Sequence, residues 1–510
     1  MRIWSSSAFA CCASPGTTSP RTASALCAGS GWPPRKLGAL ARTNHDPVAL
    51  WSGALAESEQ KVFWLDSPDV PQPQPPLGED ITCDLAIVGG GFTGLWAALH
   101  AAGDGEDVVL LEGDRCGWGA SGRNGGFLEA SLTHGFENGV SRWPDEMDTL
   151  QRLGAENFEA MREALESCGI DAAWNDAGVL GVATRPHEVG WLAEAARAER
   201  KHGGDVELLD ADAVRAEVNS PTYLAGLWHK SGNALVDPAR LAWGLRDAAL
   251  ADGVRIHEHT RVTGLRREAA GAVLETGGPR VRADRVLLAT NAFPPLVRSI
   301  RRYVVPVYDY VLVTEPLTAD RRAAIGWRRE QGVSDSGNRF HYYRLTPDGR
   351  ILWGGYEALY HFRNGMRPEL EDHAPTFELL ARNFAETFPQ LEGIRFSHRW
   401  AGAIDTSSRF CVTFGRALGG RVVYAVGYTG LGVAASRFGA RVALDLLHGR
   451  DTELTRLELV RKRPIPFPPE PIRYAVIQAT RRALARADER GGRRGLWLRA
   501  LDRIGAGFDS

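Results

Sequence analysis

The feature that most constrains the fold is a glycine-rich turn between two apolar segments. Cys83–Val88 and Asp107–Leu111 have the composition of short buried strands, and Gly94–Ala102, rich in small residues, is typical of a helix between them. A strand, a helix and a second strand within about 30 residues form one βαβ unit. The turn reads GGGFTG from Gly89 to Gly94 and satisfies G-x-G-x-x-G. The segment therefore predicts a βαβ unit that starts a parallel sheet.

Each glycine of this turn meets a steric demand of a bound pyrophosphate. Gly89 permits the tight turn, Gly91 lets the backbone approach the ligand, and Gly94 lets the helix pack close to the sheet. The N-terminus of the helix adds N–H donors and a positive dipole. Glu112 lies 21 positions after Gly91, where a carboxylate can bind ribose hydroxyls. The pattern predicts a Rossmann-type adenine dinucleotide site; the alternative is a tight βα turn without a ligand.

Two further glycine-rich segments bear on which dinucleotide is bound. Gly117–Gly126 (GWGASGRNGG) follows the second strand and contains Ser121, Arg123 and Asn124. Such a loop can wrap pyrophosphate and ribitol, which only a flavin dinucleotide offers in extended form. Ala425–Val433 (AVGYTGLGV) is a strand that enters a helix through glycines, and the N-terminus of that helix can face the flavin N1–O2 edge. The predicted cofactor is therefore FAD.

Composition excludes several other classes of protein. A net charge of −2 gives no electrostatic argument for binding nucleic acid or a membrane surface. No apolar run reaches the roughly 18 residues of a membrane span. The seven cysteines are scattered, and after the N-terminal stretch none has metal-ligand spacing, so we expect no metal site. This cysteine pattern favours a cytoplasmic location, and the excess of arginine over lysine is typical of a GC-rich bacterial genome.

Shifts in composition divide the chain. Met1–His45 lacks Asp and Glu, so we expect residues 1–50 to be disordered or to precede the true start of translation, with a transit peptide as the alternative. Residues 51–80 combine a segment of some helical character, Leu50–Asp66, with the proline-rich linker Ser67–Gly78. The basic tail 451–510 has an amphipathic pattern that suits a membrane or a partner, but we expect it to pack on the protein body as a helical extension.

The remaining pattern alternates helices and strands and becomes β-rich after residue 300. Pro347-Asp348-Gly349 separates two strands and predicts a hairpin. The predicted helices are Thr149–Ser167, Glu188–His202, Pro238–Ala251, Glu371–Phe388 and Gly432–Leu447, the last ending at Gly449. The predicted strands are Val254–Ile256, Arg261–Leu265, Val273–Glu275, Arg285–Ala289, Val304–Leu312, Arg339–Thr346, Arg350–Gly354 and Val422–Val426.

With these segments the chain resembles the D-amino-acid-oxidase-like family of FAD-dependent oxidoreductases over roughly Asp84–Asp451, and it is most similar to the gamma-glutamylputrescine oxidase branch. GGGFTGLW and GASGRNGG carry the resemblance, together with Val236–Leu241, Ala289–Ala292 and Arg399–Gly402. The resemblance implies an α/β (α+β overall) fold with a Rossmann-type FAD-binding domain and a second, mainly antiparallel β-sheet substrate domain. We assign residues 81–135, 232–300 and 396–450 to the first domain, and 136–231 and 301–395 to the second.

The resemblance also implies which residues hold FAD. They are Gly89, Gly91, Phe92, Thr93, Gly94, Glu112, Ser121, Arg123, Asn124, Gly125, Gly126, Val262, Thr290, Gly427, Thr429, Gly430, Leu431 and Gly432. Leu431 stands where the family commonly has a histidine. The cysteine or histidine to which some members attach FAD is absent, so we expect non-covalent FAD and interpret Cys411 as a small buried thiol.

The reaction implied is oxidation of a C–N bond of an amine or amino acid by hydride transfer to flavin N5, with reoxidation by O2 or a redox partner. Aromatic walls can hold an alkyl amine through cation–π contacts, although aromatic residues also favour strands for packing alone. The candidate catalytic residues are Trp400, Tyr343, His341 and Arg344, and further pocket candidates are Tyr308, Tyr310, Tyr342 and Tyr356. Arg344 can pair with a substrate carboxylate or lie solvated on the hairpin, and His341 suits a structural role better than that of a base.

Two other functions fit part of the pattern. An NAD(P)H-dependent monooxygenase or reductase normally needs a second G-x-G-x-x-G or a redox C-x₄-C, and neither occurs downstream. A non-catalytic flavin-binding subunit would share the dinucleotide motifs. The substrate, the electron acceptor and the oligomeric state do not follow from these motifs.

Overall fold

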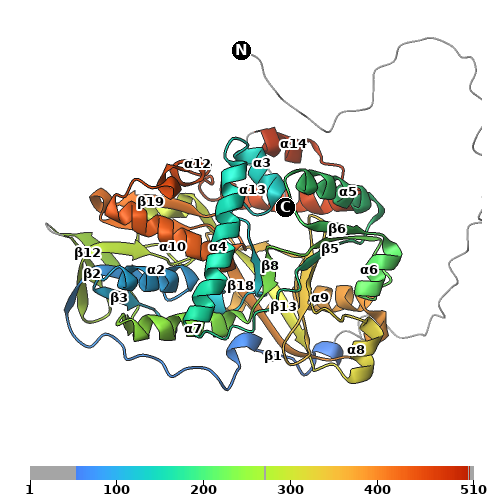
Figure 1. Ribbon diagram of the computed structural model, residues 1–510, viewed down its shortest axis with the longest axis horizontal. Coiled ribbons are helices and arrows are strands. Elements are labelled where there is room, and N and C mark those ends of the chain that lie inside the picture. The colour runs from blue at the N-terminus through green and yellow to red at the C-terminus, as the bar shows by residue number, and fades with distance from the viewer. Residues whose placement is uncertain (1–52, 269–270, 504, 506–510) are drawn as a thin grey trace, which may run out of the picture. The chain divides into compact units, whose positions relative to one another are not determined.

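The structure, a computed structural model, describes residues 53–268, 271–503 and 505. The expectations for residues 1–50 lie outside this part of the chain. The described residues belong to one compact unit, so the predicted domain boundaries stay a prediction. Two large β-sheets organise this unit. Figure 1 shows the smaller sheet, with β2, β3 and β12, beside the larger one, with β13 and β18.

The smaller sheet contains the predicted βαβ unit. β2 (Ile81–Val88) lies parallel to both β3 (Val108–Leu111) and β12 (Arg280–Leu288). Every residue of β3 is buried, as expected for a strand that is covered on both faces. The other strands of this sheet are β9 (Arg255–His257), β10 (Gly264–Arg267), β11 (Ala272–Glu275), β19 (Thr413–Ala417) and β20 (Val422–Val426).

Three helices cover one face of the smaller sheet: α2 (Phe92–Gly103), α7 (Pro238–Ala251) and α10 (Gly432–His448). α2 packs against both of the others. α2 follows β2 and α10 follows β20, and both strands are parallel to β12. The N-termini of α2 and α10 therefore lie at the same edge of the sheet, where the carboxyl ends of the parallel strands meet.

The larger sheet is mainly antiparallel, and its order is β1-β18-β13-β16-β15-β14-β5-β7-β6. Among the described strands of this larger sheet, only the pairs β1–β18 and β14–β5 are parallel. Its strands are β1 (Glu59–Gln60), β5 (Val179–Ala183), β6 (Val206–Leu209), β7 (Ala225–His229), β13 (Val304–Thr314), β14 (Gly332–Asp335), β15 (His341–Leu345), β16 (Ile351–Gly355) and β18 (Phe396–Ser407), and β17 (Leu359–Tyr360) pairs with β13.

Side chains of the larger sheet alternate between two environments. On β13, Tyr308, Tyr310 and Leu312 belong to a core that includes residues of α9 (Ala374–Thr387). Val311 belongs instead to a second cluster with Trp64 and Trp400. This period of two determines which side chains reach the space between the sheets.

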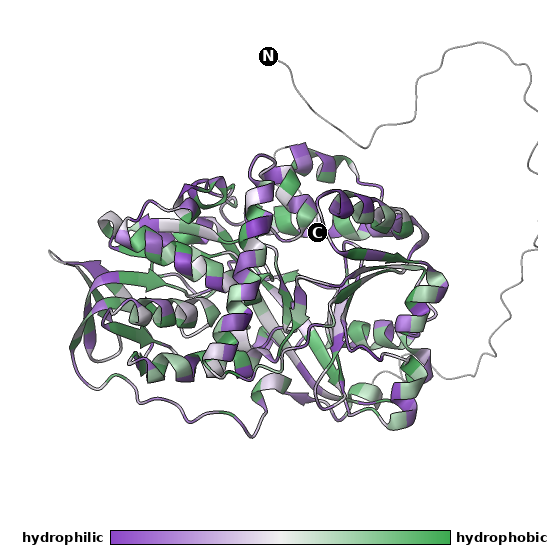
Figure 2. Ribbon diagram, in the orientation of Figure 1, coloured by the Kyte–Doolittle hydropathy of each residue, from purple (hydrophilic) through white to green (hydrophobic). Residues whose placement is uncertain are grey.

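The remaining elements connect and cover the sheets. Figure 2 shows mostly hydrophobic strands, whereas surface helices such as α4 and α5 mix both colours along their length. These elements are η1 (Phe63–Leu65), η2 (Ala120–Gly122), β4 (Phe127–Glu129), α3 (Phe136–Arg142), α4 (Met147–Ser167), α5 (Pro186–Lys201), α6 (Ala211–Glu217), β8 (Asn233–Leu235), η3 (Arg298–Arg302), α8 (Ala319–Ile325), η4 (Pro368–Leu370), η5 (Pro389–Leu391), η6 (Leu418–Gly420), α11 (Glu453–Arg456), α12 (Glu458–Arg461), α13 (Ile472–Glu489) and α14 (Leu496–Arg503). Within the described residues, no helix combines the length and apolar character that a membrane span requires.

Most predicted elements are confirmed within a few residues, including the hairpin of β15 and β16 around Gly349, whose φ is +79°. α10 ends at Gly449 with a left-handed φ of +67°, as predicted. The predicted strand Arg261–Leu265 is partly wrong, because β10 begins only at Gly264. The fold class is confirmed.

Two segments have strand pairings that the sequence did not reveal. The described part of Leu50–Asp66 has helical residues at 53–55 and in η1, and between them Glu59–Gln60 pairs with β18. The start of the segment assigned to the FAD-binding domain, Phe396–Ser407, is β18 of the larger sheet. Its antiparallel pairing with β13 along almost its whole length sets this membership.

Candidate active site

A cavity of about 1060 Å³ lies where the two sheets face each other, lined by the glycine turn, by strands of the larger sheet and by the start of α10. The predicted FAD-binding residues that line it are Gly89, Gly91, Phe92, Thr93, Glu112, Ser121, Arg123, Asn124, Gly125, Val262, Thr290, Thr429, Gly430, Leu431 and Gly432. Gly94, Gly126 and Gly427 are not among the lining residues, although each lies next to one that is. A volume of this size, at the top of the usual range for ligand pockets, suits a dinucleotide together with a small substrate.

The glycine turn is packed so tightly that side chains cannot replace its hydrogens. Gly89 has a φ of +111°, and a Cβ there would lie 2.5 Å from the Ala289 carbonyl oxygen. A Cβ on Gly94 would lie 1.9 Å from the Gly89 carbonyl oxygen. Gly94 therefore serves the turn from behind, by letting α2 approach the strand, and this explains why it does not line the cavity.

Two carboxylates brace the turn and the loop that follows it. Glu112 accepts hydrogen bonds from the backbone N–H of Gly90 at 2.7 Å and of Asp114 at 2.8 Å, while burial raises its pKa. Glu258, which the sequence did not single out, is buried and accepts a hydrogen bond from the backbone N–H of Cys116 at 2.5 Å. Its second oxygen accepts one from Gln74 in the proline-rich linker, also at 2.5 Å. The linker is thus tied to the cofactor loop.

The second glycine loop is held by side chains behind the cavity wall. Trp64 Nε1 donates to the Asn124 carbonyl at 2.9 Å, and Trp400 Nε1 donates to the Arg123 carbonyl at 2.9 Å. Arg344 Nη1 donates to the Val236 carbonyl at 2.6 Å, and the Val236 N–H in turn donates to the Gly126 carbonyl. These contacts fix the backbone of the loop without occupying the cavity.

The third segment opens the N-terminus of α10 toward the cavity. The Gly427 N–H donates to Asp405 Oδ2 at 2.6 Å, and Thr429, with a φ of +56°, donates through Oγ1 to the Gly427 carbonyl at 3.0 Å. Burial raises the pKa of Asp405 to about 6. No side chain caps α10, whose N-cap is Leu431. Its positive end can therefore stabilise negative charge in the cavity.

The four candidate catalytic residues do not line the cavity. His341 and Tyr343 alternate with Tyr342 on β15 and point to the far face, where His341 Nε2 lies 3.0 Å from Asn383 of α9 and Tyr343 packs in the core. Trp400 and Arg344 are buried behind the glycine loop, so the hypothesis of a solvated Arg344 is wrong. All four act on the site at most through other residues.

Of the additional pocket candidates, Tyr342 and Tyr356 line the cavity, whereas Tyr308 and Tyr310 are packed in the core on the other face. The sequence did not single out five of the lining carboxylates, which are Asp114, Glu129, Asp309, Glu357 and Asp405. Asp309 had a usable signal, since a lone charge between the apolar and aromatic residues of a predicted strand has to be paired or functional when it is buried. Asp405 had none, because its partners are backbone N–H groups far away in the sequence.

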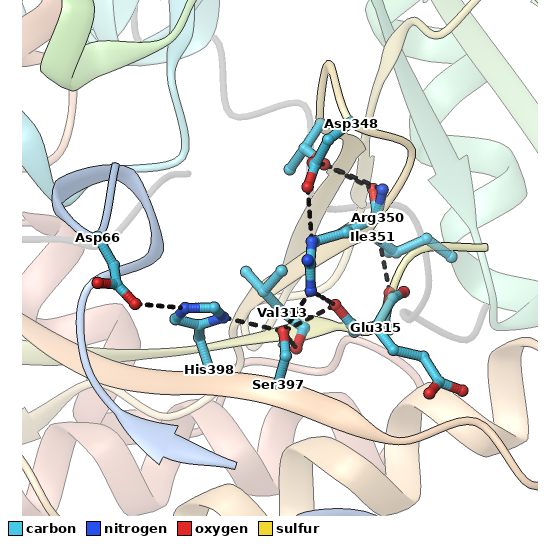
Figure 3. Close-up of polar contacts among 10 residues, drawn as sticks. Asp66, Val313, Glu315, Asp348, Arg350, Ile351, Ser397 and His398 are labelled. Atoms are coloured by element: carbon cyan, nitrogen blue, oxygen red, sulfur yellow. Dashed lines mark hydrogen bonds and ion pairs between the residues drawn. The ribbon is translucent and has the colours of Figure 1, made fainter. Parts of the chain in front are cut away.

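A second polar cluster, shown in Figure 3, contains the serine, histidine and aspartate of a nucleophilic triad, but its hydrogen bonds give it a structural role. His398 lies 3.3 Å from Asp66 and 2.9 Å from the Ser397 hydroxyl. That hydroxyl donates to the Thr314 carbonyl at 2.9 Å and accepts from Arg350 at 2.9 Å. Because its proton is directed to a carbonyl and no member lines the cavity, the cluster holds the irregular β13–β18 pairing at Thr314.

The residues around the cavity fit FAD. The tight glycine turn, the carboxylate of Glu112 and the N-terminus of α2 would hold the ADP half, whereas residues 123–125 and 429–432 would hold the flavin half. FAD in this position would supply a two-electron acceptor that no side chain can provide.

The fold and this site define a dinucleotide-binding oxidoreductase. The family described as FAD dependent oxidoreductase (DAO) matches residues 84–446. Gamma-glutamylputrescine oxidoreductase of Escherichia coli (strain K12) is 35% identical over 379 residues, which cover 73% of this chain and 85% of that protein. The chain therefore belongs to the DAO family of FAD-dependent oxidoreductases, and the predicted enzyme class and cofactor are confirmed.

Other relatives share the architecture. Glycine oxidase of Geobacillus kaustophilus (strain HTA426) is 26% identical over 298 residues, 56% of this chain and 78% of that protein. The crystal structure of glycine oxidase from Geobacillus kaustophilus superposes with a TM-score of 0.63 at 21% identity and covers 75% of this chain and 99% of that one. At this level of identity the structural match supports the fold.

Proposed function

We propose that this protein oxidises a carbon–nitrogen bond of a small amine or amino acid with FAD as the electron acceptor. The observation that carries the proposal is a single cavity that joins the dinucleotide cradle at Gly89 and Gly91 to an aromatic chamber at Tyr342 and Tyr356. The family relatives named gamma-glutamylputrescine oxidoreductase and glycine oxidase support the same chemistry.

The contribution of the chain itself is binding, orientation and exclusion of water. Tyr342, Tyr356 and Phe340 line the same chamber, and their aromatic side chains can pack against an alkyl amine. Hydride transfer from a carbon next to nitrogen needs the amine neutral, and the aromatic walls of the chamber exclude water from the reacting carbon. A dedicated base is therefore not required by the proposal.

We propose that FAD is bound without a covalent link. The thiol of Cys411 is buried in the core with α2 and α10 and does not line the cavity. The electron acceptor, O2 or a redox partner, and a cytoplasmic location stay predictions.

The proposal is tested by incubating the FAD-loaded protein aerobically with a panel of polyamines, N-methyl amino acids and D-amino acids. We expect at least one alkyl amine to yield ammonia or a shorter amine together with a carbonyl product. Oxidation of NADPH in the absence of any amine turnover would support the reductase alternative and contradict the proposal.

A further inference from the structure

The chamber of the cavity at the larger sheet contains an unpaired carboxylate. Asp309 lies on β13, and its side chain lines the cavity on the same face as Tyr342 of β15. Tyr342 Oη donates to Asp309 Oδ2 at 2.5 Å. Among the described residues, no Arg, Lys or His forms an ion pair with Asp309. A carboxylate that lines a cavity without a cationic side chain paired to it can take a cationic ligand as its partner.

The charged form of Asp309 predominates at pH 7, although its carboxylate is partly buried. Burial raises its pKa to about 6, while the Tyr342 hydroxyl and the backbone N–H groups of Tyr310 and Gly355 favour the charged form. The charge is therefore present when a ligand enters under physiological conditions.

The cations that line the cavity are already engaged or lie elsewhere. Arg123 pairs with Glu371 at 3.0 Å, and Arg339 lies 3.7 Å from the buried carboxylate of Asp488. Arg261, Arg298 and Arg301 line the cavity from segments that follow β9 and β12 of the smaller sheet. Among the described residues, the guanidinium groups of Arg123 and Arg339 are thus already paired with carboxylates of the chain and are less available to a carboxylate of the substrate.

Aromatic rings complete the surroundings of Asp309. Tyr356 has a left-handed φ of +67°, and its N–H donates to the Phe340 carbonyl at 2.7 Å. Its ring stacks on His341 at 4.8 Å between centroids with an interplanar angle of 10°, and the Arg339 guanidinium lies 4.8 Å from the ring centroid on Tyr356. His341 thereby positions a wall of the chamber. Tyrosine rings around a carboxylate favour the binding of an organic ammonium ion.

We propose that Asp309, with Tyr342 and Tyr356, binds the ammonium group of an alkyl amine and selects substrates that carry no carboxylate next to that group. This inference rests on the proposed function, which it narrows from amines or amino acids to cationic alkyl amines. The group bound at Asp309 is either the reacting amine before it loses its proton or the second amine of a diamine. Both are organic cations, and the site recognises them by the same chemistry.

The test is a binding titration of the FAD-loaded protein that does not depend on turnover. Butyltrimethylammonium is permanently charged and has no nitrogen lone pair to support oxidation, and butyrate is a carboxylate of similar length. Binding is followed through the change in the visible spectrum of oxidised FAD. We expect butyltrimethylammonium to bind and butyrate not to bind. We expect Asp309→Asn to lower the affinity for butyltrimethylammonium by about thirtyfold or more.

Asp335→Asn is the matched control. Asp335 is also a partly buried carboxylate that accepts a hydrogen bond from a tyrosine hydroxyl, that of Tyr343 at 3.2 Å, but it does not line the cavity. FAD content and thermal unfolding are measured for both variants, so that a folding defect is recognised. The inference is overturned if butyrate binds as tightly as the cation, if Asp309→Asn binds the cation as wild type does, or if folded Asp335→Asn loses as much affinity.

The same titration separates the two proposals. If the cation binds in a manner that depends on Asp309 but no amine is oxidised, the proposed function fails and the binding site stands. If alkyl amines are oxidised with the same KM by wild type and Asp309→Asn, the function stands and the binding site fails. The failure of the proposed function and the failure of the binding site therefore give different results.

Discussion

At the scale of single residues, the cofactor site depends on atoms that are absent as much as on those present. A Cβ on Gly94 would meet the Gly89 carbonyl oxygen at 1.9 Å, whereas a Cβ on Gly103, at the other end of the same helix, would meet nothing within 4 Å. The backbone, unlike the tip of a long side chain, has no easy way to yield. Gly94 therefore couples the position of α2 to the shape of the turn.

Gly94→Ala should push α2 away from β2, lower stability by about 1–3 kcal/mol and weaken FAD retention. Gly103→Ala should be neutral or slightly stabilising, because alanine is the better helix former. Thermal unfolding and FAD content after gel filtration measure both effects. Equal behaviour of the two variants would contradict the role given to Gly94.

The pH dependence of cation binding also belongs to the residue scale. Asp309, with a pKa of about 6, is charged above that pH and neutral below it, so affinity for butyltrimethylammonium should fall about tenfold per pH unit below 6. Tyr342 keeps its proton throughout, since burial raises its pKa well above the usual value. Asp405, whose pKa is also about 6, and Glu357 line the same cavity.

The titration is therefore repeated with Asp309→Asn. A flat profile in this variant assigns the pH dependence to Asp309. A profile with the same midpoint in wild type and variant would assign it to another group, such as Asp405.

At the scale of elements, the C-terminal extension holds two residues that line the cavity. The Asp488 carboxylate on α13 is buried and accepts hydrogen bonds from Asn338 Nδ2 at 2.6 Å and from the Arg339 N–H at 3.1 Å. Asn338 and Arg339 line the cavity. The family match ends at residue 446, so the carboxylate that holds this wall comes from a segment beyond the match. These hydrogen bonds agree with the expectation that the extension packs on the protein body.

Asp488→Ala should loosen the segment at Asn338 and Arg339 and raise KM for an amine by roughly tenfold, because the chamber wall shifts. FAD content should change little, since the three glycine segments are distant in sequence and keep their own contacts. Glu489→Gln is the control, because Glu489 is 66% exposed and its carboxylate lies 4.0 Å from the Arg339 guanidinium, beyond hydrogen-bond distance. Steady-state kinetics are measured for both variants. Equal KM values for the two would contradict a role of α13 in holding the chamber wall.

The sequence predicted elements well where one periodicity dominated. α4, α5, α7 and α10 were predicted within a few residues because their apolar positions repeat with the helical period. The pairing of β18 with β13 did not follow from the sequence, since a strand pattern does not identify the partner of a strand. For the same reason the alternation on β15 was visible, but which face meets the cavity was not, and His341 and Tyr343 were chosen in place of Tyr342.

At the scale of the whole molecule, the described chain brings three distant segments to one cavity. The glycine turn at Gly91, the strand at Asp309 and the helix start at Gly432 are separated by more than a hundred positions each, yet all line it. Motifs revealed the first and third because glycine spacing is a local signal. The second has no glycine motif, and the lone charge of Asp309 within a predicted strand does not show which cavity it lines, so the pairing of the larger sheet was needed.

The most direct test of the account is an anaerobic titration of the FAD-loaded protein with an alkyl amine, followed through the visible absorbance of the flavin. The account predicts that the amine bleaches the flavin to completion, while NADPH leaves it oxidised. A flavin that stays oxidised with every amine and is bleached by NADPH alone would contradict it.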